Sequence, residues 1–318
     1  MIAIIQLKKL YKRCRKFVSF KGERILSNLA CLLACIPRRR NYLAVMAIFK
    51  NEAHVLGEWC QHYRSQGVDY ILLINNDSTD NFLVEIQPYI DSGLVRLVND
   101  DRKHAQRSIY NENLVYFRFN IEWLLVCDLD EFIYARGQYC RIKDYLLTVP
   151  WTTSAIYLPW KIFGSSDCVA QPSSVIRGFV HRAHNPLPFD ADQPHRSHGL
   201  IEAKYLTRPQ RTLHLDLHGC HLLFGKARLS DGSQANNPPF QLVSEKSLDK
   251  FSLHLNHYQV QSLDFFVNVK STRGDADSKF QEQLRDRAYF DKWDLNDIVD
   301  TELADRSTSS PSTSHVAP

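Results

Sequence analysis

The chain has 318 residues, of which 44% are hydrophobic and 23% are charged. This composition is that of a soluble globular protein, and the length suffices for one sizeable core or two small ones. Eight cysteines lie scattered without a C-x-x-C pair, which argues against a disulfide-held scaffold and indicates free thiols in a reducing compartment.

Residues 1–40 form a strongly basic leader. They carry eleven Lys or Arg against the single acid Glu23, a net charge of +10. Because the whole chain carries +4, the remaining residues carry −6. A basic segment on an acidic body indicates contact with an anionic membrane surface, and a solvated, partly disordered leader is the alternative. We expect no nucleic acid partner, since the leader offers few aromatic rings for base stacking, namely Tyr11, Phe17 and Phe20.

The longest apolar run, Ile25 to Ile36, is too short to cross a bilayer. It has twelve residues, whereas a spanning helix needs about twenty. A cleaved signal peptide is disfavoured because Pro37 and three arginines follow the run. We therefore expect a cytoplasmic protein that lies peripherally on the inner membrane face.

From Tyr42 onward, short apolar runs alternate with amphipathic stretches. The helix predicted over 52–67 is ended by Gly67, and its apolar face consists of Val55, Leu56, Trp59 and Tyr63. Strands that are apolar on both faces and alternate with helices predict an α/β fold with a mostly parallel sheet flanked by helices. The predicted strands are 42–49, 70–75, 94–98 and 122–128, and the predicted helices are 52–67, 80–90 with Asp80 as N-cap, and 103–120.

After Phe132 the pattern becomes less regular. Residues 177–199 are predicted to form a long loop, or excursion, over an active site. The last stretch, 301–318, is rich in Ser, Thr and Pro from 306 on and predicts a disordered tail.

Polar clusters follow three of the predicted strands. They are Lys50-Asn51-Glu52, the run from Asn75 to Asp80, and Asp128-Leu129-Asp130-Glu131. Ligands of open parallel sheets bind beyond the carboxyl ends of the strands, so these clusters are expected to meet along one edge.

This edge lacks the glycine-rich loops that cradle phosphates in common nucleotide folds. Asp128 and Asp130 are two residues apart, which puts both side chains on one face of an extended strand end. Such a pair can hold Mg²⁺ or Mn²⁺ bridging a diphosphate. A D-x-D triplet alone is a weak signal, because most are turns or caps, but its place at the end of a buried fourth strand favours the metal site.

Five ordered stretches together resemble the family 92 glycosyltransferases and their bacterial family-2-like relatives, which have the GT-A fold. The likeness covers about residues 42–275. The stretches are FKNEAHVLGEWCQHYRSQGVDYILLINNDSTD (49–80), WLLVCDLDEFI (123–133), WKIFGSSD (160–167), KYLTRP (204–209) and LNHYQVQSLDFFVNVKSTRG (255–274).

The resemblance implies a GT-A domain over 41–300, with a nucleotide-sugar half (41–135) and an acceptor half (136–300). It implies transfer of a sugar from a nucleoside diphosphate donor, with inversion. In such enzymes the acidic triplet holds the metal on the diphosphate, so Asp130 would bind metal, Asp128 would lie toward the ribose or sugar as well as the metal, and Glu131 would be a second acid. Carried over in the same way, the donor-site residues would be Lys50, Asn51, Glu52 and Ser78.

One position departs from the family pattern. Relatives commonly have an aspartate where Asn75 stands, so the base and the strength of nucleotide binding are open. The Asn75 amide can still bond a ribose or a uracil edge.

Histidines and cations of the second half complete the expected site. His214, His218 and His221 have helical spacing, but their stretch alternates like a strand, which disfavours zinc. His218 or His257 would complete the metal shell or touch the diphosphate, with a buried structural role as the alternative. Cations that could neutralise the leaving group, or lie solvated on the surface, are Lys204, Arg208 and Arg273.

Inversion needs a carboxylate base within reach of the acceptor hydroxyl. Asp167 and Glu202 are both candidates. Trp160 and Phe163 would stack on a sugar or belong to the core.

The preferred interpretation is a metal-dependent glycosyltransferase that uses a nucleotide sugar and a glycan or lipid-linked acceptor to build a surface polysaccharide or glycolipid. A metal-dependent phosphohydrolase or nucleotidyltransferase could use the same acids. A non-catalytic carbohydrate-binding module is the third alternative.

Overall fold

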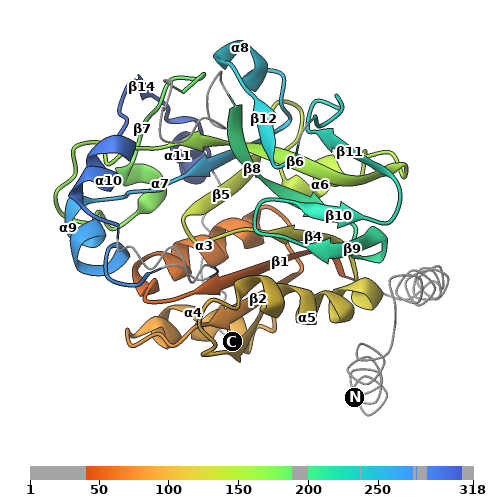
Figure 1. The fold of residues 1–318 in the computed structure, drawn as a ribbon, viewed down its shortest axis with the longest axis horizontal. Coiled ribbons are helices and arrows are strands. Elements are labelled where there is room, and N and C mark those ends of the chain that lie inside the picture. Colours follow the sequence, from red (N-terminus) through yellow and green to blue (C-terminus); the bar gives the residue numbers. More distant parts are fainter. Residues whose placement is uncertain (1–40, 188–199, 237, 275–276, 278–284, 310–318) are drawn as a thin grey trace.

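A computed structural model of the protein describes residues 41–187, 200–236, 238–274, 277 and 285–309 (Figure 1). Four parallel strands in the order β3-β2-β1-β4 form the first half of the main sheet. Helices α3, α4 and α5 connect them. The elements are β1 (Asn41–Phe49), α3 (Ala53–Ser65), β2 (Tyr70–Asn75), α4 (Phe82–Asp91), β3 (Val95–Asn99), α5 (Gln106–Asn120) and β4 (Ile121–Val126). All seven predicted elements occur in the predicted order.

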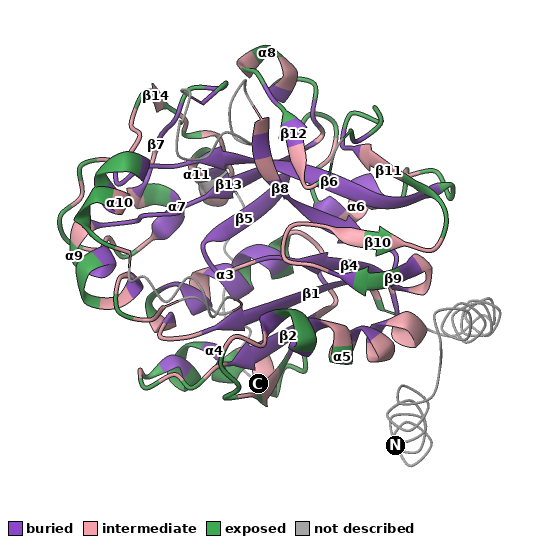
Figure 2. Cartoon of the chain, viewed as in Figure 1, coloured by how far each residue is buried: buried purple, intermediate pink, exposed green. Residues whose placement is uncertain are grey.

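The centre of this half is fully covered. In β1 every residue from Leu43 to Phe49 is buried, and Figure 2 shows the central strands in the colour of buried residues. Helix α3 packs Val55, Leu56, Trp59 and Tyr63 into the core, as predicted. The chain leaves α3 through Gly67, whose φ of +83° favours glycine and whose added Cβ would lie 2.8 Å from the Lys143 Cβ.

The predicted N-cap Asp80 is wrong. Helix α4 begins at Phe82, and Asn81 precedes it without a side-chain cap bond. The Asp80 carboxylate instead accepts a hydrogen bond of 2.8 Å from the backbone N–H of Ala53. The Asp80 carboxylate therefore binds an N–H group in the first turn of α3. This helix lies beside Asp80 in space but not in sequence.

The second half of the sheet is mixed. Strand β8 (Leu200–Thr207) is antiparallel to β4 and to β6 (Thr153–Ile162), whereas β13 (Leu253–His257) is parallel to β6 and antiparallel to β5 (Glu131–Ala135). The main path runs β3-β2-β1-β4-β8-β6-β13-β5, with β11 (Lys226–Leu229) beside β6 and β12 (Phe240–Leu242) beside β8. The predicted α/β class is confirmed, with the parallel order concentrated in residues 41–126.

Shorter elements surround the second half of the sheet. Two small antiparallel pairs are β9 (Thr212–Leu215) with β10 (Cys220–Leu222), and β7 (His181–Arg182) with β14 (Ile298–Val299). The short helices are α6 (Ile142–Leu146), α7 (Val175–Gly178), η2 (Pro209–Arg211), α8 (Glu245–Leu248), α9 (Leu263–Phe265), η3 (Phe266–Lys270) and α10 (Arg287–Trp293).

The predicted disordered tail is wrong at its start, because α11 (Glu302–Ser309) is helical. Leu303 is buried in the core, and the Glu302 carboxylate accepts hydrogen bonds from Tyr134 and Arg136. These contacts fasten the helix to β5. The rest of the predicted tail (310–318), the leader (1–40) and most of the predicted excursion (188–199) lie outside the described residues.

Two further predictions concern cysteines and membrane spans. Cys60, Cys127, Cys140, Cys168 and Cys220 carry free thiols, as predicted for the part of the chain that the structure describes. Within that same part, no helix has the length and apolarity needed to cross a bilayer.

Candidate functional site

Two of the three polar clusters interlock beyond the carboxyl ends of β1 and β2. The backbone N–H of Asn51 donates to the Ser78 hydroxyl at 3.0 Å, and the Asn51 side-chain oxygen accepts from the N–H of Thr79 at 2.8 Å. Lys50 pairs with Asp77 at 3.4 Å. The structure thus brings together the predicted donor-site residues Lys50, Asn51 and Ser78 at one edge of the sheet.

Asn75 shapes this turn. Its side-chain oxygen accepts from the N–H of Ser78 at 2.9 Å, and its amide group donates to Asn99 at 3.0 Å. The side chain is buried at the end of β2. Its side chain thus links the turn after β2 to the end of β3, and one amide hydrogen is left for another acceptor.

The third cluster, the acidic triplet, follows β4 at the same edge. Each aspartate contacts a buried lysine: Lys204 donates to Asp128 at 2.7 Å, and Lys270 donates to Asp130 at 2.6 Å. Asp128 is partly exposed and Asp130 is buried. The charge of each aspartate is therefore balanced by a lysine of the second half, Lys204 from β8 and Lys270 from η3.

The buried acids Asp130 and Glu131 differ in their electrostatic environment. Burial alone raises the pKa of Asp130, but the Lys270 charge and the proximity of His257 outweigh burial and hold the pKa well below its usual range. Burial raises the pKa of Glu131 well above its usual range, and Lys204 compensates only in part. Asp130 is thus the charged group of the pair, whereas Glu131 is favoured in its protonated form.

Glu131 is 0% exposed, so a ligand in solution cannot reach it directly. One of its oxygens accepts from the backbone N–H of Asp128 at 2.9 Å, and the other is buried without a hydrogen-bond partner among the described residues. Tyr63 donates to the Glu131 carbonyl, and Trp59 donates to the Asp128 carbonyl at 3.2 Å. Glu131 and α3 therefore fix the backbone that carries Asp128 and Asp130.

The segment from Lys270 to Arg273 joins the acidic triplet to the first cluster. Lys270 holds Asp130, while Arg273 donates to the Lys50 carbonyl at 2.9 Å and forms an ion pair with Glu52. The second Glu52 oxygen is buried without a partner in the described part of the chain. Three predicted residues, Glu52, Asp130 and Arg273, thus lie around one site.

Sequence reasoning missed Lys270. Its contact with Asp130 spans 140 residues of sequence, so no local pattern reports it. The available signal was one lysine at the end of the apolar stretch FFVNVK, where a buried charge requires a partner. The five-residue η3 has π-helical bonding, a form often found at functional sites.

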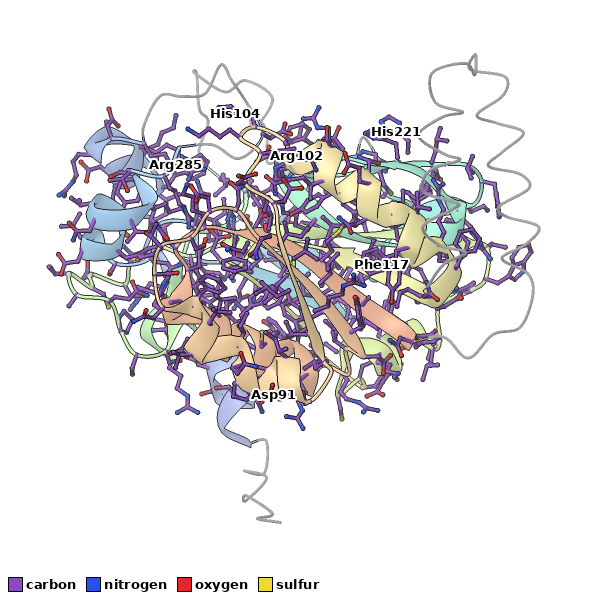
Figure 3. The ribbon with its side chains drawn as sticks, turned by 90° about the horizontal axis from the view of Figure 1, so that it is seen from below. Asp91, Arg102, His104, Phe117, His221 and Arg285 are labelled. Atoms are coloured by element: carbon purple, nitrogen blue, oxygen red, sulfur yellow. The ribbon has the colours of Figure 1, made fainter. Side chains whose placement is uncertain are left out.

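The same segment continues across the edge of the sheet. Beyond Gly274, Asp277 forms an ion pair of 2.7 Å with Arg107 of α5. Figure 3 shows Arg102 and His104, in the loop between β3 and α5, on the same side of the molecule as Arg285. Described parts of the second half therefore border the donor edge of the first half.

His257 and His218 both contact Trp160. The Trp160 ring lies 4.3 Å from the His257 ring and 5.2 Å from the His218 ring, measured between centroids. The nearest His257 nitrogen lies 3.6 Å from an Asp130 oxygen. Burial lowers the pKa of His257 despite the nearby Asp130 charge, which favours a neutral imidazole. His257 thus borders Asp130 directly, whereas His218 borders it through Trp160.

Asp130 and His257 are the candidate ligands for Mg²⁺ or Mn²⁺. No cluster of three or more His, Cys, Asp or Glu side chains suited to a metal occurs among the described residues. Asp130 and His257 nevertheless form a two-ligand set, and their 3.6 Å separation is near the roughly 3 Å between neighbouring ligands of an octahedral ion. The inner His257 nitrogen is buried without a hydrogen-bond partner in the described residues. The set fits an ion that takes most of its ligands from substrate phosphates and water.

The prediction that Arg208 lies in the donor site is wrong. Because β8 runs antiparallel to β4, Tyr205 pairs with Val126 and Thr207 pairs with Leu124. Lys204 therefore lies at the carboxyl end of β4, and Arg208 lies near its amino end, about 13 Å away along the strand. Arg208 pairs with Glu122 and stacks on the Trp123 ring at 4.3 Å.

The two predicted bases occupy different positions. Pro159 pairs with Ala203, so Glu202 lies beside Trp160 and shares a sheet face with Lys204. Glu202 is partly exposed. Asp167 is exposed in the turn after β6, with a φ of +59°, and its N–H donates to the Ser165 hydroxyl. Phe163 is fully buried in the core and cannot stack on a sugar.

The histidine spacing that suggested zinc belongs to strands, as the alternation predicted. His214 and His221 pair across β9 and β10, with ring centroids 6.0 Å apart. His218 lies in the intervening turn and contacts Trp160. The three side chains therefore do not form the helical face that their spacing alone implied.

Comparisons with known proteins extend this description. The model of glycosyltransferase family 92 matches residues 43–305. No curated protein matches the chain. Similar solved structures include S. aureus TarS residues 1–349, with 14% identity over 53% of this chain and 47% of that one and a TM-score of 0.33.

Another is glucosyl-3-phosphoglycerate synthase from Mycobacterium tuberculosis, solved with Mn²⁺, UDP and glucosyl-3-phosphoglycerate, with 10% identity over 54% of this chain and 58% of that one and a TM-score of 0.28. A further structure of S. aureus TarS has 16% identity over 39% of this chain and a TM-score of 0.29. The chain spans 22% of the length of that TarS chain and less than two thirds of the other two. Because the family model covers most of the sequence, the chain belongs to glycosyltransferase family 92.

Proposed function

We propose that the chain transfers a sugar from a nucleoside diphosphate donor to a hydroxyl group of a glycan or glycolipid, with inversion at the anomeric carbon. The observation that carries the proposal is the pairing of Asp128 with Lys204 and of Asp130 with Lys270 at one sheet edge, joined through Arg273 to the Lys50 turn. Paired charges of this kind suit a ligand that is itself a dense array of anionic oxygens.

The cations supply the electrostatic part of the mechanism. A nucleoside diphosphate leaves with additional negative charge, and donors placed in advance where that charge develops lower the barrier. Lys204 and Lys270 are buried and held in place by the carboxylates. Lys50 and Arg273, at the rim of the site, would contact the phosphates from the other side.

Asp130 and His257 would hold a Mn²⁺ or Mg²⁺ ion, and Asp128 would lie toward the ribose or sugar. When bound, the ion supplies charge neutralisation to the diphosphate oxygens. The chain's own part is to keep Asp130 ionised and the His257 imidazole neutral, which are the forms that can bind a cation.

Glu202 is the better placed of the two bases, because it shares a sheet face with Lys204 beside Trp160. In the transfer step the acceptor oxygen bonds to the anomeric carbon while the bond from that carbon to the phosphate oxygen breaks. The leaving diphosphate takes the electron pair, and the hydroxyl proton passes to the Glu202 carboxylate. Trp160 is buried like Phe163, so it would position the His257 ring 4.3 Å away and would not stack on a sugar.

A thermal-shift panel tests this proposal. The full chain is heated with nucleoside diphosphates and their sugars, with and without Mn²⁺. A ligand at a hundred times its dissociation constant stabilises the fold by about 2.7 kcal/mol. We expect at least one nucleotide sugar to raise the melting temperature, with a larger rise when Mn²⁺ is present. The proposal is contradicted if none does so and simple phosphate esters are hydrolysed instead, which would favour a phosphohydrolase.

A further inference from the structure

A group of aromatic and basic side chains lies at the opposite edge of the sheet, near the amino ends of β4 and β6. Trp151 is 71% exposed and Phe224 is 47% exposed. The guanidinium carbon of Arg211 lies 5.2 Å from the Trp151 ring centroid and 5.3 Å from that of Phe224. One arginine thus contacts two exposed rings, and we refer to these three residues as the Trp151 surface.

More cations surround the Trp151 surface. Lys226 is exposed at the start of β11, and its backbone N–H donates to Thr152, next to Trp151. The Arg118 guanidinium donates to the Thr212 carbonyl at 2.7 Å. Arg208, paired with Glu122, lies close enough that the charge of Arg211 adds to burial in lowering its pKa to about 10. The local charge is therefore positive, although the chain beyond the leader is acidic overall.

The Trp151 surface adjoins the point where the basic leader joins the domain. The Tyr42 hydroxyl donates to the Leu146 carbonyl at 3.1 Å, and the next residue, Leu147, is exposed. The first described residue, Asn41, follows directly on Arg38, Arg39 and Arg40 in sequence. Figure 1 shows the start of β1 on the same side of the molecule as β9, β10 and β11.

We propose that the Trp151 surface docks on an anionic lipid membrane, next to the attachment point of the leader. Tryptophan and phenylalanine rings favour the headgroup level of a bilayer, and arginine and lysine pair there with lipid phosphates and acidic headgroups. Charge complementarity and continuity with the +10 leader select a membrane as the partner. This inference does not depend on the identity of the sugar donor.

Docking in this manner leaves the donor site open to solution. β1 begins at Asn41 near the Trp151 surface and ends at Phe49 beside Lys50, and its nine residues span about 30 Å. The two sites thus lie at opposite ends of the same strand. A water-soluble donor could enter while the other edge rests on lipid.

The tryptophan content of the chain gives a direct test. All five tryptophans lie in the described part of the chain; Trp59, Trp123, Trp160 and Trp293 are buried, and Trp151 is exposed. Emission of the full chain is recorded with phosphatidylcholine vesicles that contain or lack phosphatidylserine. We expect a blue shift and quenching by brominated lipid with the anionic vesicles, and the loss of both signals in Trp151→Phe.

Binding itself is measured by vesicle sedimentation of the full chain. We expect Trp151→Ala combined with Phe224→Ala to weaken binding to the anionic vesicles about tenfold. The matched control changes Leu83 and Val84, which are exposed on α4, to alanine and should bind like the wild type. Because all four side chains are exposed, both variants should fold, and their melting temperatures verify this.

Three results would overturn the proposal. In the first, the wild type sediments with vesicles while its emission and quenching stay unchanged, so that the leader binds alone. In the second, binding to vesicles without phosphatidylserine is equally tight or no vesicles bind. In the third, emission shifts with protein concentration or with a polynucleotide but not with vesicles, which identifies a second copy or a nucleic acid as the partner.

Discussion

The two edges of the main sheet use charge in opposite ways. At the carboxyl edge, Lys204 and Lys270 are buried and lie within 2.7 Å of the carboxylates of Asp128 and Asp130. At the amino edge, Arg211 contacts the exposed rings of Trp151 and Phe224. Similar residue types thus form a closed ionic cluster at one edge and an open aromatic surface at the other.

This difference indicates which edge can discriminate a small ligand. Buried ion pairs are costly to desolvate, and they seldom add stability over apolar packing. Buried ion pairs at the end of a sheet hold their charged groups in fixed positions before the ligand binds. Such fixed charges suit catalysis. A partly exposed arginine between exposed aromatic rings suits a broad, fluid surface.

The largest expected effect is at Asp130. Replacing it by Asn removes the ionised carboxylate and should lower the transfer rate at least about a thousandfold, or about 4 kcal/mol of transition-state stabilisation. The measurement is sugar transfer or donor hydrolysis with a nucleotide sugar and Mn²⁺. Undiminished activity would remove Asp130 from the mechanism.

The next effect concerns the stability of the Lys270 pair. Lys270→Met leaves Asp130 as a buried charge without this partner, and we expect a loss of about 3 kcal/mol in the free energy of unfolding. Adding Asp130→Asn should recover most of this loss, because the buried charge is then gone. Urea denaturation of both single variants and the double variant measures the coupling. Strictly additive effects would show that the pair is not energetically linked.

Lys204 and Arg208 offer a matched comparison on one strand. Lys204→Met should lower kcat/KM about a hundredfold, roughly 2.7 kcal/mol, because Lys204 lies beside Asp128. Arg208→Met should leave kcat/KM within about twofold, since Arg208 lies at the other edge. Steady-state kinetics at saturating acceptor distinguish the two. Equal losses would contradict the assignment of the edges.

The smallest effect is a pH dependence at Glu131. Burial raises the pKa of this carboxyl in the folded state above its unfolded value. The folded chain then binds more protons than the unfolded chain, so the wild type loses stability as pH rises above about 4.3. Glu131→Gln cannot titrate and keeps an oxygen for the Asp128 N–H. Thermal denaturation should show the melting temperature of the variant rising relative to that of the wild type from pH 5 to pH 8. A difference that does not change with pH would contradict this reasoning.

The first half of the fold was predictable because its signals are local. Apolar runs such as Leu43–Phe49 and Tyr70–Asn75 are buried on both faces, and polar residues follow them directly. That order alone predicts that Lys50, Ser78 and Asp128 share an edge. The structure places them there.

The sequence predictions fail where a residue contacts a partner that is distant in sequence, or where the direction of a strand determines at which edge of the sheet a residue lies. Arg208 is four residues from Lys204, but the antiparallel register of β8 carries it to the opposite edge. Asp80 caps the turn of a helix that precedes it in the chain. Lys270 meets Asp130 across 140 residues. The exposure of Trp151 also depends on which strands surround it, and no local sequence pattern reports this.

The central claim is that the carboxyl edge, with its acids and lysines, binds the donor diphosphate. A crystal soaked with Mn²⁺ and a nucleoside diphosphate tests it through anomalous diffraction at the manganese edge. The account predicts an anomalous peak beside Asp130 and His257, with density for the diphosphate between Lys270 and the Lys50 turn. A diphosphate bound elsewhere, with the Asp130–Lys270 pair unchanged, would contradict it.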